Sequence, residues 1–317
     1  MAYLATKTDK TAITPILRID WDTVGRACER VVADGLDPCR LEGLVIIGVD
    51  EVSWRKHHRY LTLLTDHMAG KIVRGAEGKI VRGAEGKDTA TLDAFFDDLG
   101  SEKAAALQAV SMDMGPAFAK SVTAPGHAPQ AIICIDPFHA VKLVGDALDV
   151  LRRQTWNELR QLPDQAAARK FKGARWSLMK KPENLSDEQS ATLRKLRNRG
   201  GDLWRGYTLK EAFRGIFSGD LDPDDTAELL DRWCSKASHS GLAPFIKVAK
   251  TIRKHRDGIL AAIRLKINNA RAEGLNNHVR LITRRAYGFH SPTAALALVM
   301  LSCGPIQLQL PHERAPG

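Results

Sequence analysis

Residues 44–50 read LVIIGVD, an apolar run that ends on an aspartate. An apolar run of this length is typical of a central strand that is buried on both faces of a sheet. Two further runs follow the same pattern, AVSMD at 109–113 and IICID at 132–136. Because open α/β sheets bind ligands at the carboxyl ends of their strands, the pattern predicts a site at one edge of the sheet. Its acidic residues are Asp50, Asp113 and Asp136.

The three aspartates suggest a particular chemistry. A single aspartate after a strand is more simply explained as a helix cap or a turn residue. Three at equivalent strand ends favour a shared site. Divalent cations such as Mg²⁺ prefer carboxylate oxygens as ligands, and pairs of these ions about 4 Å apart catalyse phosphoryl transfer. The pattern therefore predicts metal-dependent chemistry on phosphodiesters, with nearby Lys and Arg holding a nucleic-acid backbone.

Another acidic residue, Glu273, lies in a basic segment near the C-terminus. If residues 268–285 are helical, Glu273 shares one face with amide and arginine side chains, and the opposite face is apolar. A solvated surface is the ordinary explanation of such a charged stripe, but the apolar face indicates a packed helix. The polar face carries Glu273, Asn276, Asn277, Arg280 and Arg284, and the apolar face carries Leu275, Val279 and Ile282.

The remaining pattern predicts a mixed α/β sheet with flanking helices. Strands are expected at 59–65 and between 70 and 87, before alternating helices and strands begin. The segment 163–257 is polar and basic, and its pattern predicts a helical insertion. The pattern of residues 258–288 predicts a basic amphipathic helix or helix pair. A short apolar helix is expected to follow at 294–301.

A perfect tandem repeat interrupts the predicted third strand. GKIVRGAE occupies 70–77 and again 78–85. Because eight is even, the repeat preserves the alternation of side chains between the two faces of a strand. Either copy can therefore occupy the strand, while the other loops out or lengthens the hairpin.

Residues 1–42 predict short helices. Asp20 is a suitable N-cap for a helix that starts at Trp21, and a shorter helix is expected at 11–17. Two short helices with a tight joint suit a helix-turn-helix, although many helical hairpins share this pattern.

The composition excludes several classes of protein. A hydrophobic fraction of 44% is enough for a packed core, which excludes disorder for most of the chain. Apolar runs such as 44–49 are far shorter than the ~20 residues that span a bilayer, and the N-terminus lacks the apolar region of a signal peptide. An odd number of cysteines, 5, without a CxxC pair favours reduced thiols in a cytosol.

The charge indicates a class of partner. The chain has 47 Lys and Arg against 37 Asp and Glu, which gives a net charge of +10. This balance favours a polyanionic partner, and a generally basic surface is the alternative explanation.

Four stretches, taken together, resemble one protein family. They are IGVDEVSWRKHHRYLTLLTD at 47–66, SMDMGPAF at 111–118, IDPFHAVKL at 135–143 and NNARAEGLNNHVRLITRRAYGF at 268–289. The chain resembles the ISL-three family of bacterial insertion-sequence transposases, which have a DDE catalytic core on a ribonuclease H-like fold. The resemblance covers nearly the whole chain.

The resemblance implies a five-stranded mixed sheet with strand order 3-2-1-4-5, flanking helices and a helical insertion. It implies that Asp50 and Glu273 are catalytic and hold two divalent ions, Mg or Mn. Asp113 and Asp136 both match family positions for the second aspartate. The implied topology favours Asp113, because strand four lies about 4.8 Å from strand one and Asp136 is one strand farther away.

Other residues receive supporting roles from the resemblance. Asp136 and His139 belong to the segment DPFH, which resembles a DxxH signature of related transposases. These two residues either support the metal ligands or orient DNA, with a structural helix N-terminus as the alternative. Asn277 is a further candidate for supporting the ligands. The candidate DNA contacts are Arg280, Arg284, Arg285 and Lys142.

The implied function is metal-dependent cleavage and strand transfer of an insertion sequence. The expected partner is double-stranded DNA, both the terminal inverted repeats and the target. The enzyme is expected to assemble as a homodimer on DNA, without a membrane, in the cytoplasm and on the nucleoid when bound.

Two departures from the family pattern give rise to alternatives. The cysteine-rich zinc ribbon that usually precedes the helix-turn-helix is not found, so we interpret the chain as an N-terminally truncated copy. One alternative is a catalytically idle remnant that only binds DNA, and another is a different nuclease on the same fold. The predicted domains are a helix-turn-helix-like DNA-binding remnant at 1–42, the first part of the core at 43–162, the helical insertion at 163–257, and the last part of the core with C-terminal helices at 258–317.

Overall fold

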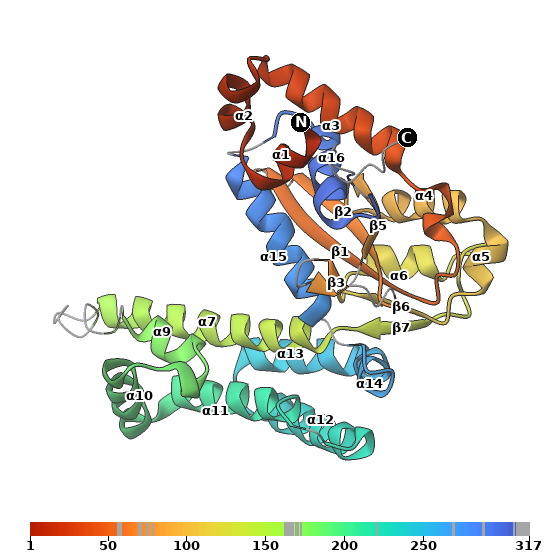
Figure 1. The fold of residues 1–317 in the computed structure, drawn as a ribbon. Helices are drawn as coiled ribbons and strands as arrows, with labels where there is room; N and C mark the ends of the chain where they lie inside the picture. Colours follow the sequence, from red (N-terminus) through yellow and green to blue (C-terminus); the bar gives the residue numbers. More distant parts are fainter. Residues whose placement is uncertain are drawn as a thin grey trace. The chain divides into compact units, whose positions relative to one another are not determined.

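The chain divides into two compact units, which are shown in Figure 1. The first contains residues 1–134 and 265–317, and the second contains residues 135–264. The computed structural model describes residues 1–55, 59–68, 72–73, 76–77, 79–161, 168, 171, 173–219, 221–267, 270–286, 289–306 and 308, without the side chains of 72–79, 270–273 and 276.

A five-stranded sheet organises the first unit. Its strand order is β5-β2-β1-β6-β7, which confirms the predicted order 3-2-1-4-5 when β5 is counted as the third strand. Strand β1 is antiparallel to β2 and parallel to β6, and β2 is antiparallel to β5. The strands are β1 (Ile46–Arg55), β2 (Arg59–Asp66), β5 (Lys79–Glu85), β6 (Ala109–Met112) and β7 (Ile132–Ile135).

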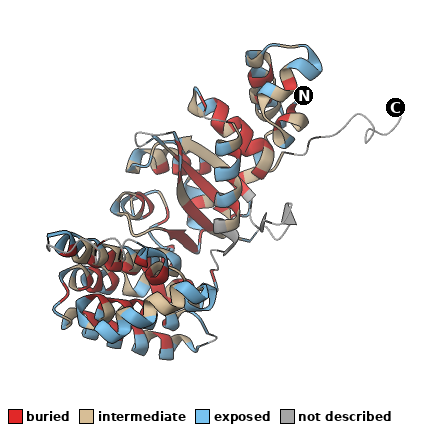
Figure 2. Ribbon diagram, turned by 90° about the vertical axis from the view of Figure 1, so that its left-hand side faces the viewer, coloured by how far each residue is buried: buried red, intermediate tan, exposed pale blue. Residues whose placement is uncertain are grey.

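Helices cover both faces of this sheet, and Figure 2 shows the buried strands between them. Leu92, Phe95 and Phe96 of α4 are buried, and α4 packs against α6 on one side. Helices α15 and α16 lie on the other side (Figure 1). The bounds are α4 (Thr89–Leu99), α5 (Ser101–Ala105), α6 (Pro116–Val122), α15 (Ala270–Arg285) and α16 (Pro292–Cys303).

The N-terminal helices pack against α16 and share its hydrophobic core. Asp20 accepts a hydrogen bond from the Thr23 amide at 2.7 Å, which confirms its predicted role as an N-cap. Asp9 caps the preceding helix in the same way. The elements are α1 (Ala2–Lys7), α2 (Lys10–Leu17), α3 (Trp21–Gly35) and the short 3-10 helix η1 (Pro38–Leu41).

The two copies of the octapeptide have different structures. The second copy forms the edge strand β5, where Ile80 and Val81 are buried. The first copy contains two short strands, β3 (Ile72–Val73) and β4 (Ala76–Glu77), which pair with each other in a separate ribbon. The duplication therefore lengthens the connection between β2 and β5, and β5 pairs with β2 along its length with one irregularity between Leu64 and Thr65.

All the elements of the second unit that follow Ile135 and that the structure describes are helical, and they include the segment 163–257 for which helices were predicted. Phe213, Trp233 and Phe245 are buried in its core, and the Trp233 indole donates to the Leu209 carbonyl at 2.8 Å. Among the described helices of the chain, none has the length and apolar character of a membrane span. The bounds are α7 (Pro137–Gln161), α9 (Ala174–Met179), η2 (Pro182–Asn184), α10 (Asp187–Arg199), α11 (Gly201–Ile216), α12 (Pro223–Ser238), α13 (Ala243–Lys254) and α14 (Arg256–Arg264).

Deleting one octapeptide tests this account of the duplication. Removing 70–77 or 78–85 gives the same sequence, and the remaining copy can fill β5 after a four-residue hairpin loop. We expect the free energy of unfolding to change by no more than about 1 kcal/mol, because closure entropy depends weakly on loop length. Chemical denaturation measures it. Ile80→Ala is the positive control and should cost about 2–5 kcal/mol. A deletion as costly as Ile80→Ala would contradict the account.

Candidate active site

Asp50 lies within the central strand β1 and is partly buried. Its Oδ1 accepts a hydrogen bond from the Glu51 amide at 2.7 Å. Because side chains alternate along a strand, Asp50 lies on the same face as Val52 and Trp54. Val52 and Trp54 are buried in the hydrophobic core that includes α15, so Asp50 belongs to the α15 face of the sheet.

Asp113 follows directly after β6, the parallel neighbour of β1. Gly48 pairs with Ser111, and Asp50 and Asp113 each lie two residues further along. Parallel neighbouring strands are about 4.8 Å apart, so this register, continued by two residues, predicts that the two aspartates lie next to each other at the carboxyl end of β6. Asp113 Oδ1 accepts from the Gly115 amide at 2.7 Å. A Cβ at Gly115 would also lie 2.7 Å from that oxygen, so a larger residue there would displace the Asp113 carboxylate.

Helix α15 carries Glu273, and this helix packs against β1. The predicted apolar face is confirmed, since Leu275, Val279 and Ile282 are buried together with Val52 and Trp54 of β1. Glu273 lies two residues before Leu275 on this helix, and its side chain is outside the described residues. The backbone thus brings the Glu273 segment to the same face of the sheet as Asp50.

The polar stripe of α15 reaches solvent at Asn277, Arg280 and Arg284. Arg280 Nη1 donates to Asn277 Oδ1 at 3.2 Å. Arg285 has a structural role, because its guanidinium donates to the carbonyls of Ala5, Thr6 and Lys7 at 3.3, 3.0 and 3.0 Å. These bonds cap the C-terminus of α1, where backbone carbonyls lack partners within the helix.

Asp136, His139 and Lys142 belong to the second unit. Asp136 is buried at the N-terminus of α7, and its Oδ1 accepts from the Phe138 amide at 2.9 Å. Its Oδ2 lies 3.8 Å from His139 Nε2. Lys142 is exposed on α7. The hydrogen bond from the Phe138 amide is typical of a residue at a helix N-terminus, as one of the two sequence interpretations expects.

Glu51 is an acidic residue that follows Asp50 in β1 and feels the charge of Asp113, and the sequence interpretation did not select it. Burial and the nearby charges of Asp113 and Asp50 raise the pKa of Glu51 to about 7, while Lys87 lowers it. The pair of adjacent acidic residues, DE at 50–51, was the feature of the sequence that could have identified Glu51. Strand alternation directs Glu51 to the opposite face from Asp50, which is why the pattern of acids after strands did not select it.

The carboxylates suit a divalent cation in charge and in donor type. Within the described part of the chain, no group of three or more His, Cys, Asp or Glu side chains forms a complete metal site. The predicted set also includes Glu273, whose side chain lies outside that part. Asp50 and Asp113 are therefore the described members of the set.

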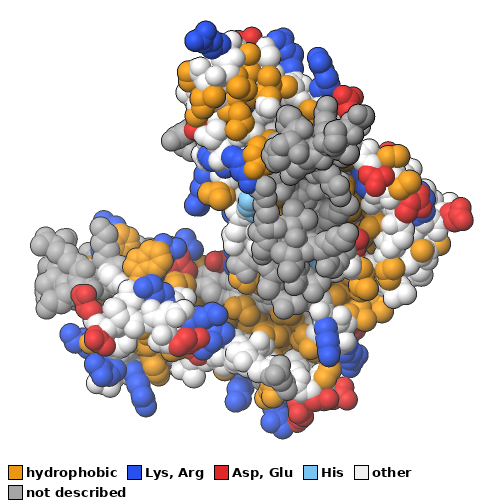
Figure 3. Space-filling view, viewed as in Figure 1, with side chains coloured by type: hydrophobic (Ala, Val, Ile, Leu, Met, Phe, Trp, Pro, Cys, Tyr) orange, Lys and Arg blue, Asp and Glu red, His pale blue; other side chains and the backbone are white. Residues whose placement is uncertain are grey.

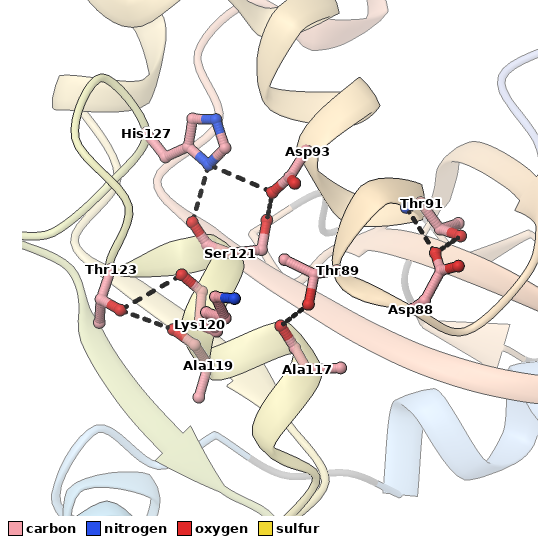
Figure 4. Close-up of polar contacts among 10 residues, drawn as sticks. All are labelled: Asp88, Thr89, Thr91, Asp93, Ala117, Ala119, Lys120, Ser121, Thr123 and His127. Atoms are coloured by element: carbon pink, nitrogen blue, oxygen red, sulfur yellow. Dashed lines mark hydrogen bonds and ion pairs between the residues drawn. The ribbon is translucent and has the colours of Figure 1, made fainter.

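A Ser–His–Asp group elsewhere in this unit has a structural role (Figure 4). Ser121 Oγ, which is fully buried, donates to Asp93 Oδ1 at 2.5 Å. His127 Nδ1 lies 2.7 Å from the Ser121 carbonyl oxygen and its ring stacks on Phe96. In a catalytic triad the histidine would instead accept the serine hydroxyl proton. This group joins α4 to α6 and to the loop before β7.

Comparison with known proteins identifies the family. The family model DDE_Tnp_ISL3, described as a transposase, matches residues 47–298. The chain belongs to this transposase family. Two related proteins from Mycobacterium tuberculosis (strains CDC 1551 / Oshkosh and ATCC 25618 / H37Rv), each a transposase for insertion sequence element IS1557, are 39% identical over 333 residues, covering 98% of this chain and 72% of theirs. A transposase for IS1001 from Bordetella parapertussis is 30% identical over 282 residues, covering 88% of this chain and 66% of its own.

The raised pKa of Glu51 gives this transposase a testable pH dependence. The folded chain holds the Glu51 proton more tightly than the unfolded chain, whose pKa is near the ordinary 4.5. The free energy of unfolding should therefore fall as pH rises from about 4.5 to about 7. Glu51→Gln removes this penalty and should stabilise the transposase by on the order of 2 kcal/mol at pH 8, with a smaller effect at pH 4.5.

Urea denaturation at both pH values, in a chelator that removes divalent cations, measures this difference. Glu102→Gln is the matched control, because Glu102 is exposed on α5. If the free energies of unfolding of the two variants changed equally with pH, the surroundings of Glu51 would not raise its pKa, and the prediction would be wrong.

Proposed function

We propose that this transposase is a DDE enzyme that cleaves DNA and transfers the cut strand, with Asp50, Asp113 and Glu273 as its catalytic residues. The observation that carries the proposal is the register of β1 with β6, which pairs Gly48 with Ser111 and so brings Asp50 beside Asp113. The packing of α15 on the Asp50 face supports the third residue.

The carboxylates of Asp50, Asp113 and Glu273 would hold two divalent cations, Mg or Mn. When bound, these ions supply the activation of the attacking oxygen and the stabilisation of the leaving oxygen. After burial, the charges of Asp113 and Asp50 also raise the pKa of Glu51, and this clustering of negative charge favours a cation.

The side chains of the first unit would then have distinct tasks. Asp50 and Asp113 fix the position of the phosphodiester through their shared sheet edge, and Asn277 holds Arg280 beside it. Arg280 and Arg284 contact phosphate oxygens. Water is the first nucleophile and a DNA 3′-hydroxyl is the second. In the second unit, Asp136 orders the N-terminus of α7, and Lys142 offers an exposed positive charge to DNA.

The proposed partner is double-stranded DNA, both the terminal repeats of the element and the target, bound by a homodimer. The net charge of +10 favours this partner. Figure 3 shows Lys and Arg side chains over the N-terminal helices and, separately, over the helical unit. In the cell, DNA binding would place the enzyme on the nucleoid.

The catalytic assignment predicts the effect of removing single carboxylates. Asp50→Asn and Glu273→Gln should each reduce magnesium-dependent nicking of terminal-repeat DNA to the rate without metal, because a ligand is lost. Magnesium should also raise the Tm of the wild type and have little effect on Asp50→Asn, since a ligand stabilises only the state that binds it.

Asp97→Asn is the matched control, because Asp97 is an exposed aspartate on α4 of the same unit. It should keep both the nicking activity and the thermal shift. Nicking by Asp50→Asn at the rate of Asp97→Asn would contradict the assignment.

A second comparison separates Asp113 from Asp136. Asp113→Asn should abolish nicking. Asp136→Asn should remain active and folded, because asparagine caps a helix about as well as aspartate does. Nicking assays and melting curves on both variants test this, and loss of activity in Asp136→Asn alone would assign the second metal ligand to Asp136.

A further inference from the structure

A large pocket lies within the first unit, beyond the ends of β1 and α15. Its volume is about 1050 Å³, and its walls come from the first three helices, the last residues of β1, the C-terminus of α15, and Phe289, His290 and Leu298 in and before α16. Asp50, Asp113 and Glu273 are not among the residues that line it. A cavity of this volume is at the upper end of the range for sites that hold small molecules or part of a larger ligand.

The lining of the pocket is strongly basic. Lys10, Arg55, Arg284 and Arg285 line it, and Asp9 is the acidic residue among its described walls. Asp9 is engaged as the N-cap of α2, where its Oδ1 accepts from the Ala12 amide at 2.9 Å. A concave surface with such an excess of one charge concentrates ions of the opposite sign, so the pocket favours an anion.

Two of these cations have no ionic partner in the described part of the chain. Arg55 is exposed at the end of β1, and Arg284 is exposed on the last turn of α15. Arg59, the strand partner of Arg55, is different because it forms an ion pair with Glu85 at 3.3 Å. Arg55 and Arg284 are therefore the arginines available to a ligand.

The pocket also contains a buried hydrogen-bond donor without an acceptor. Trp54 lines the pocket and is 4% exposed, and its indole Nε1 has no hydrogen-bond partner within the described part of the chain. A buried donor that lacks a partner costs about 1–3 kcal/mol, which a ligand oxygen would recover once the indole turned its N–H toward the pocket. The Trp54 indole thus favours a ligand that offers an acceptor, and the basic walls favour an anionic one.

Packing holds the remaining cation in the wall. The Lys10 ammonium lies 4.2 Å from the ring centroid of Trp21, a cation–π contact, and the same ring meets His290 edge to face at 4.2 Å. A Cβ at Gly25 would lie 2.8 Å from Lys10 Nζ, so glycine there leaves space for the lysine. The position of this charge is therefore fixed before any ligand binds.

The pocket lies at a defined distance from the proposed catalytic residues along both elements. Asp50 and Arg55 are five residues apart in β1, which corresponds to about 17 Å. Glu273 and Arg284 are eleven residues apart in α15, which also gives about 17 Å. One strand of B-form DNA advances 3.4 Å per nucleotide, so this distance corresponds to about five nucleotides.

We infer that this pocket binds the phosphodiester backbone of a DNA strand about five nucleotides from the phosphate that reacts at Asp50. The inference rests on the proposed function for the identity of the ligand. Arg55 and Arg284 contact its phosphates, Lys10 adds a fixed positive charge, and the Trp54 indole donates to an oxygen. The pocket holds the strand so that the phosphate at the carboxylates stays in place.

The test is DNA binding by the full chain without divalent cations, measured by fluorescence anisotropy. The probes are a single-stranded 12-nucleotide DNA and a blunt duplex of roughly the same length, chosen to exceed the estimated five-nucleotide span. Arg55→Ala with Arg284→Ala should weaken binding of at least one probe and lower the log–log salt slope by about 2, one for each phosphate contact. Trp54→Phe keeps an aromatic ring, removes the donor, and should weaken binding of the same probe by about tenfold.

The matched control is Arg59→Ala with Lys103→Ala. It removes the same charge from the same unit, but both side chains are exposed members of surface ion pairs. Melting curves confirm that every variant is folded. Loss of affinity in the pocket variants alone supports the inference, and the probe affected shows whether the strand is single or paired. Equal affinity of pocket and control variants for both probes would overturn it.

The design separates the pocket from the proposed chemistry. Asp50→Asn should bind both probes like the wild type and fail to nick DNA. If the pocket variants lost affinity while Asp50→Asn still nicked DNA, the catalytic assignment would be wrong and the pocket would stand. If Asp50→Asn lost nicking while the pocket variants bound normally, the pocket inference alone would be wrong.

Discussion

The parallel pairing of β1 with β6 is the constraint on which the candidate site depends. It matches Ile46 with Ala109 and Gly48 with Ser111, and the two aspartates follow two residues later on each chain segment. A shift by one residue would turn one aspartate to the other face of the sheet, because side chains alternate. The burial of Ile47 and Val49 on β1 and of Val110 on β6 opposes such a shift, since it would expose apolar side chains. The hydrophobic core thus fixes the separation of two charged groups that take no part in it.

Much of this arrangement was predictable from the sequence, because the responsible residues are local or periodic. The apolar runs predicted the central strands, and Asp20 marked the start of α3. The split of the octapeptide between β5 and a separate ribbon was not predictable, since two identical segments have identical propensities and only their distance from β2 distinguishes them. Arg285 is a similar case, because its acceptors belong to α1, almost the whole chain length away.

The candidate site was predictable in part for the same reason. Asp50 and Asp113 follow apolar runs, so a strand pattern reveals them. The pocket at the ends of β1 and α15 joins Lys10, Arg55 and Arg284 from three distant segments, and no spacing in the sequence relates them. The unsatisfied indole N–H of Trp54 could not be predicted from the sequence either, because a tryptophan in a strand normally indicates only that the side chain is packed. A site formed by residues from distant segments can be recognised only in the three-dimensional structure. Residues placed by the alternation of side chains along a strand can be predicted from the sequence.

The octapeptide also has a consequence for how this hairpin changes during evolution. A copy of eight residues keeps every following side chain on its original face, so slippage at the repeated coding sequence can add or remove a copy without disturbing β5. We expect the sheet to accommodate chains with different numbers of copies, with the ribbon of β3 and β4 as the part that changes. Helix α15 contacts β4, so each change in copy number alters what lies beside the helix that carries Glu273. The hairpin is therefore a place where a change in chain length can alter the surroundings of α15 while the core sequence stays constant.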